Sequence, residues 1–185
     1  MPSSNPSQHN RDMAEASNHL REPSCRRALK IAEYESRRLA RSHYENFLVA
    51  SVLLPRRLRQ PFYNVYAFCR TADDLADESA SPEEAIARLA DFQGQLDESF
   101  EGNPPQNLFL ALMHTVEQFD LSKQPFDDLL DAFRQDQFKY RYQDFSELLE
   151  YCRRSANPVG RIVLQLGCCL EEQTAQLSDQ ICTGL

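Results

Sequence analysis

The sequence predicts an all-α fold with a single domain, for three reasons. Its 185 residues include only five glycines and ten prolines, whereas folds built from strands and tight turns use glycine at many turns. Apolar residues recur every three or four positions through most of the chain, which is the period of a helix. Proline-containing breaks separate these stretches, and a chain of this length normally forms one hydrophobic core.

Residues 1–23 are predicted to form a disordered arm, and residues 24–185 a helical domain. The arm is rich in Ser, Asn, Pro and His and has no periodicity. The first helix is expected to begin at Cys25 and to continue through Phe47 and Val52 as far as Pro55, because proline interrupts helices. Its apolar face consists of Ala28, Ile31, Ala32 and Leu39.

A second helix is expected after Pro55, carrying Phe62 to Glu78, and it either runs through Pro61 or restarts there. Ser81-Pro82-Glu83-Glu84 has the pattern of a capping box with proline in the first turn, which predicts a helix from there to about Phe100. Further helices are predicted at Leu108 to Phe119 and after Pro125.

Three short helices are predicted in the C-terminal part, over Ser146 to Ala156, Val159 to Leu170 and Leu177 to Leu185, for a total of about seven or eight. Asn157-Pro158 separates the first two of these. An apolar stripe is predicted to continue to the final residue through Leu177, Ile181 and Leu185, so that the chain would end inside a helix.

The composition disfavours several classes of function. With 20 basic against 28 acidic residues, the chain has a net charge of −8, which disfavours binding to nucleic-acid phosphates. Its six cysteines form neither a CxxC pair nor a spaced Cys/His quartet, so neither a zinc site nor a disulfide scaffold is expected. We interpret them as reduced, which favours a cytoplasmic location.

No membrane span is predicted. The first 20 residues lack an apolar stretch of signal-peptide length, and the longest apolar run, Phe47 to Leu54, is too short to cross a bilayer. Membrane contact is therefore expected to be peripheral. The densest basic cluster is Arg56, Arg57 and Arg59; it fits a solvated helix start or a contact with anionic lipid headgroups.

Two acidic residues carry the main functional signal. On a helical projection with about 100° per residue and Phe62 at zero, Asp73 lies at about 20° around the helix axis and Asp77 at about 60°. This face also holds Val65, Tyr66, Cys69 and Arg70, and it is the one expected to point toward the core. The face opposite, expected to meet solvent, holds Asn64, Thr71 and Glu78.

Two inward carboxylates one turn apart require a cationic partner, because burying unpaired charges is costly. Arg70 can offset one charge. Mg²⁺ suits carboxylate oxygens better than Zn²⁺ does, and it commonly bridges carboxylates to a substrate phosphate. A solvated acidic helix face is the alternative, and an EF-hand is excluded because its central glycine is missing.

Three motifs resemble the squalene and phytoene synthases, a family of all-α isoprenoid synthases. They are HYENFLVAS at 43–51, LLPRRLRQPFYNVYAFCRTADDLADE at 53–78, and YCRRSANPVGRIVLQL at 151–166. The resemblance covers about Cys25 to Leu185 and implies an isoprenoid-synthase helical bundle. Within the family, HYENF and NPVGR look most like the bacterial hopanoid-pathway branch that converts presqualene diphosphate into hydroxysqualene or squalene.

The resemblance implies a role for each matching residue. Asp73 and Asp77 match the first aspartate-rich motif, which holds Mg²⁺ against the substrate diphosphate, and Asp74 would add an outer contact. Arg70 matches the arginine that binds the diphosphate. Further substrate contacts are implied for His43, Asn46, Phe47, Tyr66, Tyr151, Val159, Gly160 and Val163, with Gly160 allowing close approach of the lipid.

The implied chemistry is Mg²⁺-assisted loss of diphosphate from a prenyl substrate, such as farnesyl or presqualene diphosphate, in a dry aromatic cavity. Where the family carries a second aspartate-rich motif, this sequence ends at Ile181 to Leu185. We therefore expect a C-terminally truncated bundle with little or no turnover by itself. Two alternatives are a head-to-head farnesyl transferase that makes presqualene diphosphate, and a non-catalytic helical partner of a related synthase subunit.

Overall fold

The computed structural model describes residues 23–42 and 54–185, and these form eight helices without any strand. The helices are α2 (Pro23–Ser42), α4 (Arg56–Asp77), α5 (Pro82–Phe100), α6 (Leu108–Phe119), α7 (Gln124–Asp136), α8 (Phe145–Ser155), α9 (Asn157–Leu166) and α10 (Glu172–Gly184). The predicted all-α class is therefore confirmed. The predicted N-terminal arm, apart from Pro23, and the stretch with His43, Asn46 and Phe47 lie outside the described residues.

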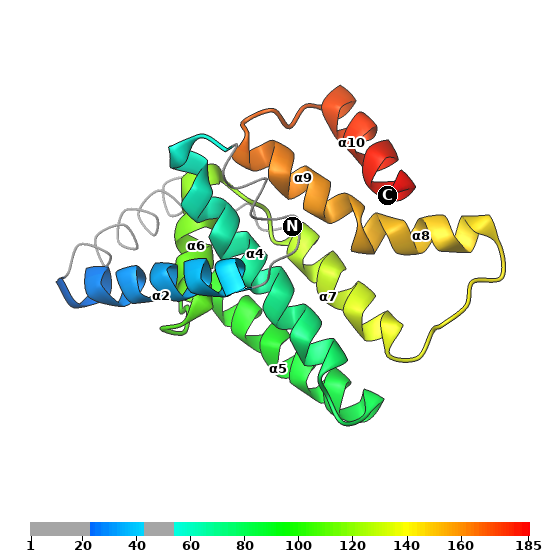
Figure 1. The fold of residues 1–185 in the computed structure, drawn as a ribbon, viewed down its shortest axis with the longest axis horizontal. Helices are drawn as coiled ribbons and strands as arrows, with labels where there is room; N and C mark the ends of the chain where they lie inside the picture. The colour runs from blue at the N-terminus through cyan, green and yellow to red at the C-terminus, as the bar shows by residue number, and fades with distance from the viewer. Residues whose placement is uncertain (1–22, 43–53) are drawn as a thin grey trace, which may run out of the picture.

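Helix α4 lies at the centre of the bundle (Figure 1). It contacts α2, α5, α6, α7 and α9. Helix α2 lies across α4 and α6, whereas α9 contacts α4 and α7 on one side and α8 and α10 on the other (Figure 1). Pro61 lies inside α4, so the second predicted helix runs through this proline.

Four phenylalanines from four helices form the centre of the core. Phe68 of α4 lies 5.2 Å from Phe92 of α5, 6.2 Å from Phe109 of α6 and 5.2 Å from Phe126 of α7, measured between ring centroids. The contacts are tilted or edge-to-face, which are the favourable geometries for aromatic rings. Phe68, Phe109 and Phe126 are completely buried.

The start of α5 follows the predicted capping pattern in part. The Glu84 N–H donates to the Ser81 hydroxyl over 3.2 Å, and Pro82 occupies the first turn. The Glu84 carboxylate, however, accepts from the backbone N–H of Ala80 rather than from that of Ser81. One half of the capping box is therefore formed, and the other half is displaced by one residue.

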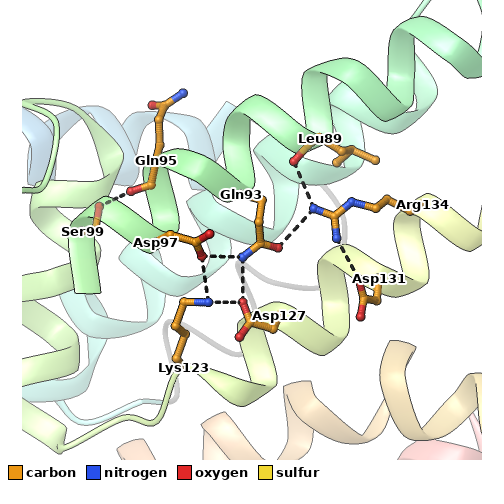
Figure 2. Close-up of polar contacts among 9 residues, drawn as sticks. All are labelled: Leu89, Gln93, Gln95, Asp97, Ser99, Lys123, Asp127, Asp131 and Arg134. Carbon is orange, nitrogen blue, oxygen red and sulfur yellow. Dashed lines mark hydrogen bonds and ion pairs between the residues drawn. The ribbon is translucent and has the colours of Figure 1, made fainter. Parts of the chain in front are cut away.

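A polar network joins α5 to α7 (Figure 2). Lys123 forms ion pairs with Asp97 at 2.8 Å and with Asp127 at 2.5 Å. Gln93 donates to Asp127 over 2.7 Å and accepts from Arg134 over 3.2 Å. These contacts link α7 to α5 through Asp127 in its first half and Arg134 near its end.

The sequence projection of α4 is wrong about Asn64, which it placed on the solvent face. Asn64 is only 1% exposed. Its amide donates to the carbonyl of Ala111 and to the hydroxyl of Thr115, both at 3.0 Å, and its carbonyl accepts from Gln60 over 2.9 Å. A buried amide with all these partners is stable inside a core, and hydrophobicity alone does not reveal such partners.

The C-terminal apolar stripe is exposed. Leu177 and Ile181 of α10 are 53% and 64% accessible, and Leu185 is fully exposed. Helix α10 is attached to α9 mainly through its other face, where Arg161 binds Asp179 with two contacts of 3.0 and 2.6 Å. Among the described residues, no helix is long and apolar enough to cross a membrane.

Candidate functional site

The predicted site begins with an arginine that holds two aspartates on α4. Arg70 contacts Asp73 at 3.1 Å and Asp74 at 2.5 Å. The three residues lie three and four positions apart, so one helix face brings them together. Their side chains are partly accessible, at 30% for Arg70, 37% for Asp73 and 26% for Asp74.

The surroundings of Arg70 keep it charged. Burial acts to lower its pKa, but the carboxylates of Asp74 and Asp73 act in the opposite direction, and the net pKa is raised above its ordinary value. Its Nε atom is buried and has no hydrogen-bond partner within the described parts of the chain. A charged, partly accessible guanidinium is suited to binding an anion such as a diphosphate.

Asp77 continues the acidic face toward α7. Its charge helps to raise the pKa of Asp136, at the end of α7, where burial is the largest cause. The Tyr151 hydroxyl of α8 donates to Asp136 over 2.8 Å, and the ring of Tyr142 lies 5.3 Å from that of Tyr151. The site therefore draws on three helices, namely α4, α7 and α8.

Asp136 is the residue that the sequence analysis missed. It shares no motif with Asp73 and Asp77, and only the packing of α7 beside α4 brings it near them. One signal was available, because an acidic side chain in the last turn of a helix is disfavoured by the helix dipole and so indicates a specific partner. The structure supplies this partner as Tyr151.

The prediction that both aspartates point into the core is wrong in part. Asp73 is half-buried, but Asp77 is exposed. The buried residues of α4, such as Phe68, Ala72 and Ala76, define a core face that is turned away from the aspartates. Charged carboxylates stay at the margin of the core because water or an ion must solvate them there.

The other predicted contacts lie in different surroundings. Tyr66 is half-buried and close enough to Arg70 to act on its charge. Val159 and Val163 are 44% and 42% exposed. Gly160 faces α10, where an added Cβ would lie 2.3 Å from the Ser178 hydroxyl oxygen and 2.6 Å from the Cys182 sulfur. This corrects the expectation that Gly160 admits a lipid, because a neighbouring helix makes the close approach.

The donor set fits Mg²⁺ in one respect. Asp73 and Asp77 offer carboxylate oxygens, the ligands that Mg²⁺ prefers, and this ion is usually held by one or two carboxylates together with substrate phosphates. Within residues 23–42 and 54–185, no group of three His, Cys, Asp or Glu side chains converges as a complete metal site. The arrangement therefore suits an ion shared with a phosphorylated ligand.

Covalent catalysis by Cys69 is disfavoured. Burial, together with the charge of Asp73, raises the pKa of this thiol to about 12. A neutral thiol is a poor nucleophile. All six cysteines are free in this structure.

A hollow of ≈ 810 Å³ lies elsewhere, between α7, α8, α9 and α10. It is an open groove beside the Arg161–Asp179 ion pair, and neither Arg70 nor any of the site carboxylates lines it. We place the candidate site at the acidic face of α4, because Arg70, Asp73 and Asp77, the residues suited to binding diphosphate and Mg²⁺, lie there.

Comparison with known proteins gives consistent matches. Residues 40–185 match the family model for squalene/phytoene synthase. The chain is 37% identical over 144 residues to hydroxysqualene synthase from Rhodopseudomonas palustris, and this match covers 76% of the chain and 47% of that protein. It is 31% identical over 133 residues to 15-cis-phytoene synthase from Synechococcus elongatus, a match that covers 72% of the chain and 43% of that protein.

Solved structures agree with these matches. Squalene synthase HpnC from Alicyclobacillus acidocaldarius superimposes with a TM-score of 0.80 at 45% identity, over 85% of this chain and 59% of that one. A dehydrosqualene synthase superimposes with a TM-score of 0.72 at 29% identity, over 84% of this chain and 54% of that one. The chain thus spans about half the length of the relatives that it matches. The predicted isoprenoid-synthase fold is confirmed, and the chain belongs to the squalene/phytoene synthase family.

Proposed function

We propose that this chain contributes the diphosphate-binding face of a synthase that ionises presqualene diphosphate and yields hydroxysqualene or squalene in hopanoid biosynthesis. The observation that carries the proposal is the cluster of Arg70, Asp73 and Asp74 on α4, with Asp77 beside it. Similarity to a hydroxysqualene synthase and to HpnC, at 37% and 45% identity, supports this branch over the phytoene synthases at 30–33%.

Arg70 is proposed to bind the leaving diphosphate. Asp73 and Asp74 hold its guanidinium in place and keep it charged, so the cation is already oriented before substrate arrives. Mg²⁺ would be held by Asp73 and Asp77, with Asp74 as an outer contact, and when bound it would neutralise the negative charge that builds on the departing diphosphate.

Tyr151 and Asp136 are proposed to shape the neighbouring wall. The hydrogen bond from Tyr151 to Asp136 fixes the ring at the junction of α7 and α8. An aromatic face held in this way can stabilise a nearby carbocation. Substrate contacts by Tyr66, Val159 and Val163, and by the predicted residues His43, Asn46 and Phe47, belong to the same proposal.

The test is a binding measurement with one matched pair of variants. Calorimetry with presqualene diphosphate should show an affinity for this chain that rises on the order of tenfold when Mg²⁺ is added, because the ion bridges ligand and carboxylates. Asp73→Asn should abolish the increase. Glu78→Gln, an exposed residue just past the end of the same helix, should leave it unchanged.

Arg70→Ala should weaken diphosphate binding with or without Mg²⁺, by about 1.5–3 kcal/mol, the usual value of a hydrogen bond to a charged group. Equal, metal-independent binding by the unaltered chain and by Asp73→Asn would contradict the assignment. Products formed from farnesyl and from presqualene diphosphate without nicotinamide, measured for a synthase that contains this chain, would distinguish the proposed reaction from head-to-head farnesyl transfer.

A second candidate is a non-catalytic partner of a related synthase subunit. Its support is the exposed apolar set on α9 and α10, comprising Val159, Val163, Leu177 and Ile181. A partner subunit would cover these exposed side chains. Analytical ultracentrifugation with such a subunit would reveal a stable complex. The double substitution Leu177→Ser and Ile181→Ser should dissociate this complex.

A further inference from the structure

Two adjacent cysteines lie in the connection between α9 and α10. Residues 167–171 form this connection, which joins the end of one helix to the start of the next (Figure 1). Cys168 and Cys169 are both free and both exposed, whereas the other four cysteines are less accessible. Because the oxidation of cysteine depends on exposure, these two thiols are the ones that an oxidant in solution reaches most easily.

Cys168 has a left-handed backbone conformation, with a φ of 57°. Its N–H donates to the carbonyl of Gln165 over 2.9 Å. The N–H of Cys169 donates to the carbonyl of Leu164, also over 2.9 Å. These two bonds form the Schellman motif that ends α9, in which glycine usually occupies the left-handed position. A cysteine takes this position although its side chain disfavours the conformation, and non-glycine residues held in this way are frequent at functional sites.

Cys169 also anchors the start of α10. Its carbonyl accepts from the N–H of Glu171 over 3.1 Å and from the hydroxyl of Thr174 over 2.6 Å. Its thiol donates to the carbonyl of Gly167 over 3.2 Å. The backbone of the two cysteines therefore belongs both to the end of α9 and to the beginning of α10.

Consecutive cysteines can form a disulfide, but only a strained one. Their Cα atoms are about 3.8 Å apart across a trans peptide, whereas the Cα atoms of a disulfide are usually about 4.4–6.8 Å apart. A strained and exposed disulfide is easily reduced, and it is typical of regulatory thiols rather than of structural bridges. The disulfides of proteins in reducing compartments are mostly of this transient kind.

We propose that Cys168 and Cys169 form a reversible redox pair, which a hydroperoxide oxidises and a dithiol reduces. The Cys168 sulfur attacks the O–O bond of the hydroperoxide, which gives a sulfenic acid and releases water or an alcohol. The Cys169 sulfur then attacks the sulfenic sulfur, so that the S–S bond forms and the sulfenic oxygen leaves as water. In total, two thiols lose two electrons and two protons, and one hydroperoxide takes them up.

The first attack is assigned to Cys168 because the carbonyl of Gly167 accepts the thiol proton of Cys169. Closing the ring between neighbouring residues changes the backbone of both. The bonds that end α9 and the carbonyl that anchors α10 are then disturbed together, so oxidation loosens the attachment of α10. The proposal goes beyond the proposed function and does not depend on it, because no residue of the acidic face of α4 takes part.

The test treats the full chain with hydrogen peroxide, alkylates the remaining thiols and measures peptide masses without reduction. Cleavage by trypsin and by a protease specific for glutamate releases residues 162–171, which contain Cys168 and Cys169 and no other cysteine. This peptide is expected to have lost two hydrogen atoms and to carry no alkyl group. Dithiothreitol should restore both thiols.

Three variants separate the roles of the two cysteines. Cys169→Ser should accumulate a sulfenic acid that reacts with dimedone, because the second thiol is missing, whereas Cys168→Ser should not. Cys168→Gly should fold at least as stably as the unaltered chain, since glycine suits the left-handed position, and it should form no disulfide. Cys25→Ser is the matched control, with one thiol removed from α2, and it should oxidise like the unaltered chain.

Hydrogen exchange measures the consequence for α10. Exchange in this helix should rise when the disulfide forms and fall again after reduction, and peroxide should not change it in Cys168→Gly. The proposal would be overturned by unreacted thiols in residues 162–171, by a bridge from either cysteine to a third one or to a second molecule, by dimedone labelling of Cys168→Ser instead of Cys169→Ser, or by unchanged exchange in the oxidised protein. Asp73→Asn should form the disulfide normally, so failure here and failure of the proposed function are distinguishable.

Discussion

Asn64 shows how a single polar side chain can belong to the core. Its amide joins α4 to α6 through Ala111 and Thr115, and it is almost completely buried. The cost of burying an amide is offset when each of its polar atoms finds a partner. This residue therefore contributes to helix docking, although its polarity placed it on the solvent face of the projection.

Asn64→Ala should lower the free energy of unfolding by about 2 kcal/mol, because it removes buried hydrogen bonds and leaves the Thr115 hydroxyl with one partner fewer. Urea denaturation measures the difference. Thr71→Ala, on the face where the projection placed Asn64, should change stability by less than about 0.5 kcal/mol. If the two substitutions changed the free energy of unfolding equally, the original placement of Asn64 on the solvent face would be correct.

The candidate site was predictable at the residue scale only where it is local. Arg70, Asp73 and Asp74 lie within five positions of one helix, so spacing permits both contacts, although the sequence predicted that Arg70 would offset only one charge. Asp136 comes from another helix more than fifty residues later in the chain. Spacing carries no information about such a contact, because the packing of α7 decides it.

At the scale of elements, Gly160 determines how closely α10 can approach α9. Ser178 and Cys182 of α10 occupy the space that a side chain at position 160 would need. The Thr183 hydroxyl also donates to the side-chain amide oxygen of Asn157 over 3.0 Å, and the Arg161–Asp179 ion pair completes the attachment. If a side chain at position 160 pushed α10 away from α9, all these contacts would weaken together.

Two glycine substitutions test this packing. Gly94→Ala in α5, where nothing lies within 4 Å of an added Cβ, should stabilise the protein by about 0.5–1 kcal/mol through helix propensity. Gly160→Ala should give no such gain and should increase hydrogen exchange in α10. If Gly160→Ala were as stabilising as Gly94→Ala, with α10 still protected, this account of α9–α10 packing would be wrong.

The pairing of α2 with α6 includes a pH-sensitive contact. His114 of α6 lies half-buried, with its Nδ1 atom 3.5 Å from the Glu33 carboxylate. The hydrogen bond to Glu33 raises the pKa of His114 and outweighs the opposite effect of burial. Protonation of His114 therefore stabilises the docked arrangement.

This stabilisation should be complete below the unfolded-state pKa of about 6.5 and should disappear as the pH rises through the higher pKa of the folded state. His114→Gln should thus lower stability at pH 5.5 by about 0.5 kcal/mol, the value of a partly exposed ion pair. It should have less effect at pH 8.5. Thermal unfolding at the two pH values measures both differences, and a larger loss at pH 8.5 would contradict the assignment.

At the scale of the whole molecule, Phe68 connects four helices. Its ring contacts Phe92, Phe109 and Phe126, each from a different element. A residue shared in this way couples the helices into one cooperative unit. The acidic face of α4 depends on the same packing, because α7 and α4 must dock before Asp136 can lie near Asp77.

Phe68→Ala should destabilise the protein by about 3–5 kcal/mol, the cost of a cavity left by a buried phenylalanine. Because this loss approaches the total stability of a small domain, Phe68→Leu provides a milder variant, with an expected loss of about 1–1.5 kcal/mol. Phe138→Ala, at a residue 67% exposed, should be nearly neutral. Denaturant titrations of the three variants would show whether Phe68 has this central role.

The sequence by itself determined the helical class, most helix positions, the family and the pairing of Arg70 with one aspartate. These features arise from interactions between residues near one another in the chain, which periodicity, breakers and motifs record. Tertiary structure alone decided that Asn64 is buried, that Asp77 is exposed, that Gly160 packs against α10 and that Asp136 joins the site. Each of these depends on which helices meet, and helices distant in sequence are brought together by burial of the shared core rather than by any local pattern.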